Sequence, residues 1–271
     1  MFYKDFIDKG FLVIKSAFSK DLIKKIQNLI ISEINPELKN KNFSFKENYS
    51  IFSLNAKKAS NTYEYVKKFY DILIFHKIYS ELLQSKKIFQ VLSSILGKDL
   101  CHIEDPSLVL NLPQKSNPKD NYLYKNWHQE IWSGTSTSTL ILWTPIFQSE
   151  EKSGQIEIIE SSHQWGHIPH NNRTPTMLPK NYKSIKTNLS YTDIIIFHSL
   201  SLHRSLPLIS KDGKYNPRLA MPTSVRNFKY NNHSFDMNKN WKIFSISELT
   251  AIEQKLGNHY LSPFRLQNLE K

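Results

Sequence analysis

The sequence has little of several features that would define its class. A single cysteine, Cys101, stands in 271 residues, so an internal disulfide framework is excluded. No apolar stretch reaches the length of a membrane span, and no uninterrupted apolar run follows Met1–Asp5 as a secretory signal would require. We therefore expect a protein of the reducing cytoplasm, with no membrane span.

Arginine is also scarce. Only five of the 36 basic residues are Arg, and the lysines are spread along the chain rather than clustered. The formal charge of +12 mildly favours an anionic ligand. No zinc-finger or RNA-recognition signature is present, and no stripe of aromatic and basic residues suggests stacking on a single strand. We expect a small-molecule substrate, with an anionic one favoured, and no nucleic-acid partner. The oligomeric state is left open.

Apolar and aromatic residues are plentiful. They make up 39% of the chain, with 16 Phe, 13 Tyr and five Trp, which is ample for a sizeable core. No internal repeat, low-complexity tract or clean linker divides the sequence. We therefore expect one domain over residues 1–271.

The first 97 residues are predicted to be mainly helical. Gly10–Ile14 is a short strand-like run, and Ser19 then caps an amphipathic helix that ends before Asn35. A second helical pattern runs from Tyr63 to Leu96, with Gly97 as its stop.

From residue 98 to 228 the pattern changes to short runs rich in β-branched and aromatic residues, separated by turn-forming stretches. Strands are expected at 108–110, 127–132, 139–147, 155–160, 193–197, 200–206 and 219–228. Residues 229–271 form a C-terminal extension, in which Ser245 and Glu248 read as the capping box of a short helix. The fold class is thus mainly β with flanking helices, as a sandwich or barrel.

The run Trp127–Trp132 carries the first chemical signal. In a strand, His128 and Glu130 project to one face while Gln129 points to the other. An imidazole and a carboxylate placed in this way can occupy adjacent positions on one metal ion. A second histidine would complete a 2-His-1-carboxylate triad, which suits non-haem Fe(II).

The second signal lies further along the chain. An apolar strand, Asp193–Phe197, leads to His203, and Arg218 follows 15 residues later. His203 is a candidate second imidazole, and the planar fork of Arg218 suits a bidentate grip on a carboxylate. His198 is predicted to be a packed core histidine.

Four blocks in order resemble the phytanoyl-CoA dioxygenase family of Fe(II)/2-oxoglutarate oxygenases. They are Gly10–Ile14 with its following helix, Trp127–Glu130, Ser153–His163, and Asp193–Ser205 with Arg218. The resemblance implies a double-stranded β-helix (jelly roll, cupin-like) core with an N-terminal helical layer. It also implies Fe(II) held by His128, Glu130 and His203, with 2-oxoglutarate and O₂ as co-substrates.

The same resemblance assigns further roles. Arg218 would hold the distal carboxylate of 2-oxoglutarate, assisted by Ser205 and, less directly, by Asn111. The implied reaction hydroxylates a C–H bond of a small metabolite and releases succinate and CO₂. Trp132, Trp143 and His163 are candidate substrate-pocket residues, and residues 161–190 form either a lid or a surface loop.

Two departures from the family pattern leave alternatives open. The family's usual acid is Asp, and here Glu130 is one methylene longer. The spacing from His203 to Arg218 is also long, so Arg204 and Arg226 remain candidates for the carboxylate. A non-redox protein on the same core is the alternative function, either a sensor or a zinc hydrolase or isomerase, because the same ligands suit Zn²⁺.

Overall fold

The structure is a computed structural model that describes residues 2–34, 78–103, 108–111, 126–147, 155–208, 218–230 and 241–255. Its α-helices are α1 (Phe2–Lys9), α2 (Lys20–Ile34), α5 (Ile78–Leu83), α6 (Lys86–Leu96) and α7 (Glu248–Lys255), and its short 3₁₀ helices are η2 (Glu130–Ser133) and η3 (Ser162–Trp165). Its strands are β1 (Phe11–Ile14), β2 (Leu100–Ile103), β3 (Val109–Asn111), β4 (Thr139–Phe147), β5 (Ile156–Ile159), β6 (His170–Asn171), β7 (Thr174–Pro175), β8 (Ser184–Lys186), β9 (Ile194–His198), β10 (His203–Ser205), β11 (Arg218–Asn227) and β12 (Trp241–Ser245).

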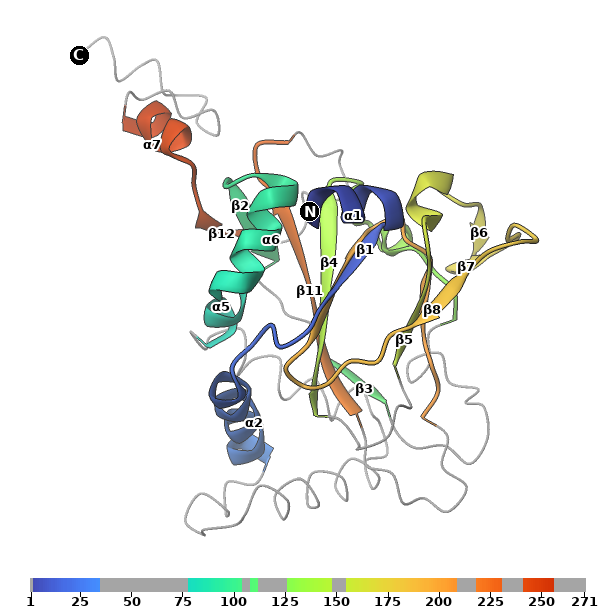
Figure 1. Cartoon of the computed structure of the whole chain (residues 1–271), viewed down its shortest axis with the longest axis horizontal. Coiled ribbons are helices and arrows are strands. Elements are labelled where there is room, and N and C mark those ends of the chain that lie inside the picture. Colours follow the sequence, from blue (N-terminus) through green and yellow to red (C-terminus); the bar gives the residue numbers. More distant parts are fainter. Residues whose placement is uncertain are drawn as a thin grey trace.

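The larger sheet is antiparallel, with the strand order β1-β9-β4-β11-β2-β12 and with β3 beside β11. Helices α2, α5 and α6 cover its outer face (Figure 1). They do so because their apolar residues recur at helical spacing, as Ile23, Ile26 and Ile30 do in α2. These side chains pack in one cluster with Leu142 of β4 and Met221 of β11.

The smaller sheet, β10-β5-β8, faces the inner side of the larger one. Trp143 and Phe197 of the larger sheet meet Ile156 and Ile158 of the smaller sheet in a second apolar cluster. Two antiparallel sheets therefore enclose a core, with helices on one side (Figure 1). The predicted mainly β, jelly-roll architecture with a helical layer is confirmed.

Several predicted element ends are also confirmed. Ser19 Oγ accepts a hydrogen bond of 3.1 Å from the backbone N–H of Leu22 in α2. Gly97 follows α6 with φ +80°, a conformation that residues with a Cβ rarely adopt. Of the second predicted helical stretch, residues 63–77 lie outside the described part of the chain.

Three expectations are corrected. Residues 127–132 do not form a strand, because the chain turns into η2 at Glu130. The residue that caps α7 is Ser247, whose Oγ accepts from the N–H of Thr250 at 3.3 Å, while Ser245 ends β12. In addition, β2 and β12 were not expected, although they form one flank of the larger sheet.

Residues 161–190 fold into η3, a hairpin of β6 and β7, and β8. The hairpin turns through Asn172 and Arg173, both with positive φ. Its role as a lid stays a prediction. None of the helices in the described ranges combines the length and the apolar character needed to cross a membrane.

Candidate metal and co-substrate site

Two histidines that are distant in sequence meet in a backbone bridge. The N–H of His128 donates to the carbonyl of His203 at 2.9 Å, and the N–H of His203 donates to that of His128 at 3.1 Å. Paired residues in an antiparallel bridge place their side chains on one face. The two imidazole centroids are consequently only 4.1 Å apart.

Glu130 brings the carboxylate to the same point. Its Oε1 lies 3.3 Å from the Nε2 atom of His128 and 3.3 Å from that of His203. One ligand atom from each of the three residues lies within 4.8 Å of the others. The turn into η2, rather than the pleat of a strand, makes His128 and Glu130 neighbours.

The hydrogen bonds of the two histidines fix which nitrogen faces the cluster. Nδ1 of His128 lies 2.7 Å from the carbonyl of Asn126, and Nδ1 of His203 lies 3.0 Å from that of Ser201. A carbonyl only accepts, so each Nδ1 carries a proton and each Nε2 faces the centre, where a neutral imidazole would present a lone pair. Burial, and then the neighbouring His128, lowers the pKa of His203, although Glu130 opposes this. Neutral imidazoles and a carboxylate fit a divalent transition metal ion.

Arg218 is the second notable feature of the interior. It begins β11, is 1% exposed, and its guanidinium lies 4.8 Å from the ring centroid of Trp143. None of its three guanidinium nitrogens has a hydrogen-bond partner within the described part of the chain. Burial lowers the pKa of Arg218 to about 9, which leaves it cationic at neutral pH. A buried cation in this state calls for an anion.

The other two predicted co-substrate residues lie around Arg218. Asn111 is its direct partner in the β3–β11 pairing, and the Asn111 amide donates to the carbonyl of Leu206 at 3.1 Å. Ser205, the residue before Leu206, lies two positions after His203 in β10 and therefore on the same face. Asn111 thus links the start of β11, where Arg218 lies, to the residue that follows β10, the strand of His203 and Ser205.

The alternative arginines are placed differently. Arg204 is on the opposite face of β10, where Glu157 accepts from its Nε at 2.7 Å and pairs with its Nη2 at 2.6 Å. Arg226 lies eight residues further along β11, roughly 26 Å at about 3.3 Å per residue. Its guanidinium stacks on Trp241, 4.0 Å from the ring centroid. Of the three candidate arginines, Arg218 is the one whose guanidinium has no hydrogen-bond partner among the described residues.

The three candidate substrate-pocket residues are not together. Trp132, in η2, stacks on His170 with a centroid distance of 4.5 Å. Trp143 lies under Arg218. His163 points to the N-terminal helix, where its Nε2 donates to the carbonyl of Ile7 at 2.9 Å. Of the three, only Trp132 lies next in sequence to the metal cluster.

Sequence reasoning missed two residues near the site. Glu157 of β5 forms an ion pair with Arg204. In the sequence, the one indication of such a role is that Glu157 is a polar residue within an apolar strand. Gln129 is fully buried, although the strand pattern predicted only that it points away from His128 and Glu130. Its side-chain bonds follow from the η2 turn, for which the sequence carried no signal.

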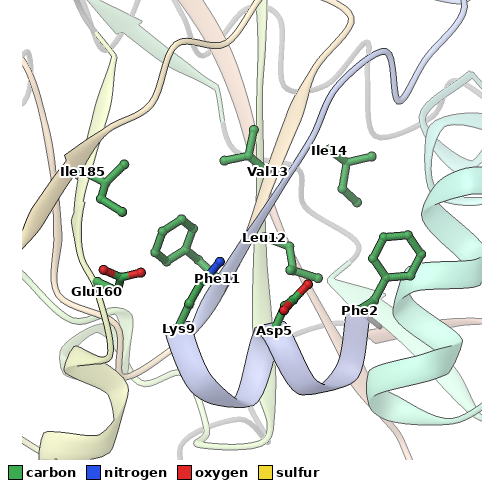
Figure 2. Close-up of a pocket in the computed structure, with 9 residues that line it drawn as sticks. All are labelled: Phe2, Asp5, Lys9, Phe11, Leu12, Val13, Ile14, Glu160 and Ile185. Carbon is green, nitrogen blue, oxygen red and sulfur yellow. The ribbon is translucent and has the colours of Figure 1, made fainter.

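A surface cavity of about 340 Å³ is lined by α1, by β1 and by Glu160 and Ile185 (Figure 2). None of the three clustered metal-ligand candidates lines it. Phe11 lines it and packs in one cluster with Phe197, whose ring centroid is 4.4 Å from that of His203. Phe11 and Phe197 therefore lie between this cavity and His203 of the candidate metal site.

Comparison with known proteins gives both a family and a fold. The sequence model of the family described as "Phytanoyl-CoA dioxygenase (PhyH)" matches residues 6–215. The non-heme monooxygenase ThoJ, in its apo form, is similar in structure, with a TM-score of 0.63 and 13% identity over 92% of this chain and 85% of that one.

Two further solved structures are similar. The non-heme α-ketoglutarate-dependent carbocyclase SnoK from nogalamycin biosynthesis has a TM-score of 0.51 and 10% identity over 83% of this chain and 82% of its own. The epimerase SnoN, in complex with Fe³⁺, α-ketoglutarate and nogalamycin RO, has a TM-score of 0.50 and 9% identity over the same shares, 83% and 82%. At these identities the structures establish the shared fold.

Proposed function

Because the protein belongs to the phytanoyl-CoA dioxygenase family, whose model covers residues 6–215, we propose that it is an Fe(II)- and 2-oxoglutarate-dependent oxygenase. The observation that carries the proposal is the His128–Glu130–His203 cluster, with both Nε2 atoms turned toward one carboxylate oxygen. These three residues would hold the metal on one face and leave its other positions open.

Arg218 has the chemistry to bind the co-substrate. Its buried fork would form two parallel hydrogen bonds to the distal carboxylate of 2-oxoglutarate. The ring of Trp143 beneath it excludes water from one side of that ion pair. Ser205 adds a hydroxyl on the same face of β10 as His203. Asn111 binds the carbonyl of Leu206, directly after the end of β10, and so holds this end in place.

When bound, iron and 2-oxoglutarate supply the activation of O₂, with release of succinate and CO₂. The chain would position the metal: the two Nδ1–H groups anchor the imidazoles to backbone carbonyls, and buried apolar side chains fill the space between the two sheets. We propose that the outcome is hydroxylation of a small molecule. Retention of Glu130 supports this, since a halogenating relative needs the acid's position for chloride.

Related proteins of the same fold are described as a monooxygenase, a carbocyclase and an epimerase. In such a set the oxidative outcome depends on how the substrate is held over the metal. Trp132, two residues after Glu130, forms a stacked pair with His170, and this pair is our candidate for one wall of that pocket.

The test needs no substrate. Fe(II) and then 2-oxoglutarate are added to the metal-free protein without oxygen, and the visible charge-transfer band of the chelate is recorded. Glu130→Ala and Arg218→Ala should weaken this band. Arg226→Ala, which removes the alternative arginine at the far end of β11, should leave it unchanged.

The same experiment separates the alternative function. Bound iron with no band, in a protein that remains folded, would favour a non-redox metal protein, because the ligand types alone also suit Zn²⁺. Arg218, whose guanidinium has no hydrogen-bond partner among the described residues, has no role in that alternative, which is why we place the alternative second.

A further inference from the structure

Gln129, between two of the proposed ligands, is completely buried. Its amide nitrogen donates to the carbonyl of Gly166 at 2.8 Å and to that of Leu200 at 2.7 Å. Its amide oxygen accepts from the N–H of Ile168 at 3.0 Å. One side chain therefore binds two segments that are distant from it in sequence.

The first of these segments delivers the third ligand. Leu200 lies in the turn between β9 and β10, three residues before His203. The turn is braced at both ends, because Ser201 N–H donates to the carbonyl of His198 at 2.8 Å and Leu202 N–H donates to Ser162 Oγ at 2.9 Å. A bond from Gln129 to this turn thus fixes the chain of His128 and Glu130 against the chain of His203.

The second segment leads into the β6–β7 hairpin. Gly166, with φ +72°, turns the chain out of η3, and Ile168 follows it two residues before His170. The stack of His170 on Trp132 is a second contact between this segment and η2. Movement of the hairpin and movement of η2 are therefore mechanically linked.

We infer that Gln129 is a positioning residue that sets the placement of Glu130 relative to His203 and couples metal binding to residues 166–170. The inference rests on the proposed metal site, and it adds a residue and a linkage to that site. Only an amide fits the bonding pattern of two donated bonds and one accepted bond. A Glu of the same shape would set a carboxylate oxygen against two carbonyl oxygens, and a Met would leave all three backbone groups unpaired.

The linkage has a thermodynamic consequence. If ordering of residues 166–170 favours metal binding, metal binding must order those residues to the same degree. The amide of Ile168 reports this, because it donates to Gln129 itself. Leu189 is a matched control, since its N–H donates in the same way to Oε1 of another buried glutamine, Gln155, at 3.2 Å.

The first measurement uses the wild-type protein. Backbone hydrogen exchange is compared with and without saturating Fe(II), under anaerobic conditions. We expect metal to slow exchange at Ile168 several-fold more than at Leu189. Equal effects at both amides would overturn the linkage, whereas a wild-type protein that binds no metal would overturn the proposed site beneath it.

The second measurement uses variants. Gln129→Met should lower the affinity for Fe(II) by about ten- to a hundredfold, the usual scale for the supporting shell of a metal site. Gln27→Met is the control: Gln27, in α2, is also buried and donates to the carbonyl of Ile146 at 2.7 Å, but on the outer face of the larger sheet. Its metal affinity should match that of the wild type. Equal affinities in all three proteins would show that Gln129 only fills space.

Discussion

At the scale of single residues, Arg218 has an unusual energetic position. Its side chain is 1% exposed and no described group accepts from it, so among the described residues nothing forms an ion pair that would offset the desolvation cost of the guanidinium. The face of Trp143 offsets part of this cost. A residue retained under these conditions is better explained by a ligand than by stability.

This argument makes a prediction for Arg218→Met. Methionine keeps the apolar contact with Trp143 and removes the buried charge, so the metal-free variant should melt at the same temperature as the wild type or higher. Its affinity for 2-oxoglutarate, measured calorimetrically with the metal-loaded protein, should fall about a hundredfold or more. A variant that is less stable but binds 2-oxoglutarate normally would show that Arg218 is structural.

His198 makes a second prediction at this scale, concerning pH. Burial, and then the nearby His163, lowers the pKa of His198 to about 4, against a bond to the carbonyl of Thr137. Between about pH 6.5, the ordinary value, and pH 4 the unfolded chain binds a proton that the folded chain excludes, so the free energy of unfolding falls as the pH falls. At about 1.4 kcal/mol per pH unit, His198 should account for about 2 kcal/mol between pH 7 and pH 5.

Urea unfolding of the metal-free protein at the two pH values provides the measurement. His198→Gln should show a smaller loss than the wild type, though not zero, because burial also lowers the pKa of His163 and His203. His167→Gln, at an exposed position, is the mutational control. Equal losses in His198→Gln and the wild type would contradict the assignment.

At the scale of elements, the junction of α1 and β1 depends on one glycine. Gly10 has φ +79°, and a Cβ there would lie 2.3 Å from Nδ1 of His163 and 2.9 Å from Ser201 Oγ. The junction therefore lets η3 and the β9–β10 turn approach the backbone closely. Both of those segments support the metal cluster.

Gly10→Ala should destabilise the protein by more than about 2 kcal/mol, because steric displacement of His163 adds to the backbone strain of about 1–2 kcal/mol. Gly166→Ala separates the two effects: Gly166 has φ +72°, yet a Cβ would meet nothing within 4 Å. Gly166→Ala should lower the free energy of unfolding by the backbone strain alone, about 1–2 kcal/mol. Thermal melts of both variants test this, and equal losses would refute the proposed contact.

Elements were predictable where the apolar run was long or where the signal was local. The run 139–147 gave β4 to the residue, and Ser19 and Gly97 marked helix ends because caps act locally. Residues 127–132 failed because their conformation is set from outside: Ile131 N–H donates to the carbonyl of Ser199 at 3.3 Å, a contact absent from any local window. For the same reason β2, which pairs with β11 and β12, and β12, which pairs with β2, carried no clear signal.

The candidate site shows the same division. The ligand types His128, Glu130 and His203 were visible in the sequence, since metal chemistry restricts residue identity. Arg218 was also chosen from the sequence, with Arg204 and Arg226 as alternatives. That Glu157, on the neighbouring strand β5, binds Arg204 could be read only from the fold. Gln129 also required the fold, because its partners lie 37, 39 and 71 residues away.

At the scale of the whole molecule, we expect the metal to join the two sheets and so to stabilise the folded protein. His203 belongs to the smaller sheet, while His128 and Glu130 precede β4 of the larger one. A metal at one hundred times its dissociation constant adds about 2.7 kcal/mol to the free energy of unfolding. For a chain of this size that corresponds to a rise in melting temperature of roughly 5 °C or more.

Differential scanning calorimetry with and without Fe(II), in the absence of oxygen, tests this prediction. Glu130→Ala should lose the rise while keeping its metal-free melting temperature. Equal rises in both proteins would place the bound metal elsewhere.

The pairing of β1 with β9 also determines when the molecule can form during synthesis. Phe11 pairs with Phe197, and His128 bridges to His203. Strand β1 and the pair His128 and Glu130 therefore find their partners only once residues 194–205 have been synthesised. A nascent chain on the ribosome therefore holds β1 unpaired until β9 is made, and it holds His128 and Glu130 without His203 from residue 130 to residue 203. Both are completed within a few residues of each other, so we expect the three residues to bind iron only in a chain whose sheets are already closing.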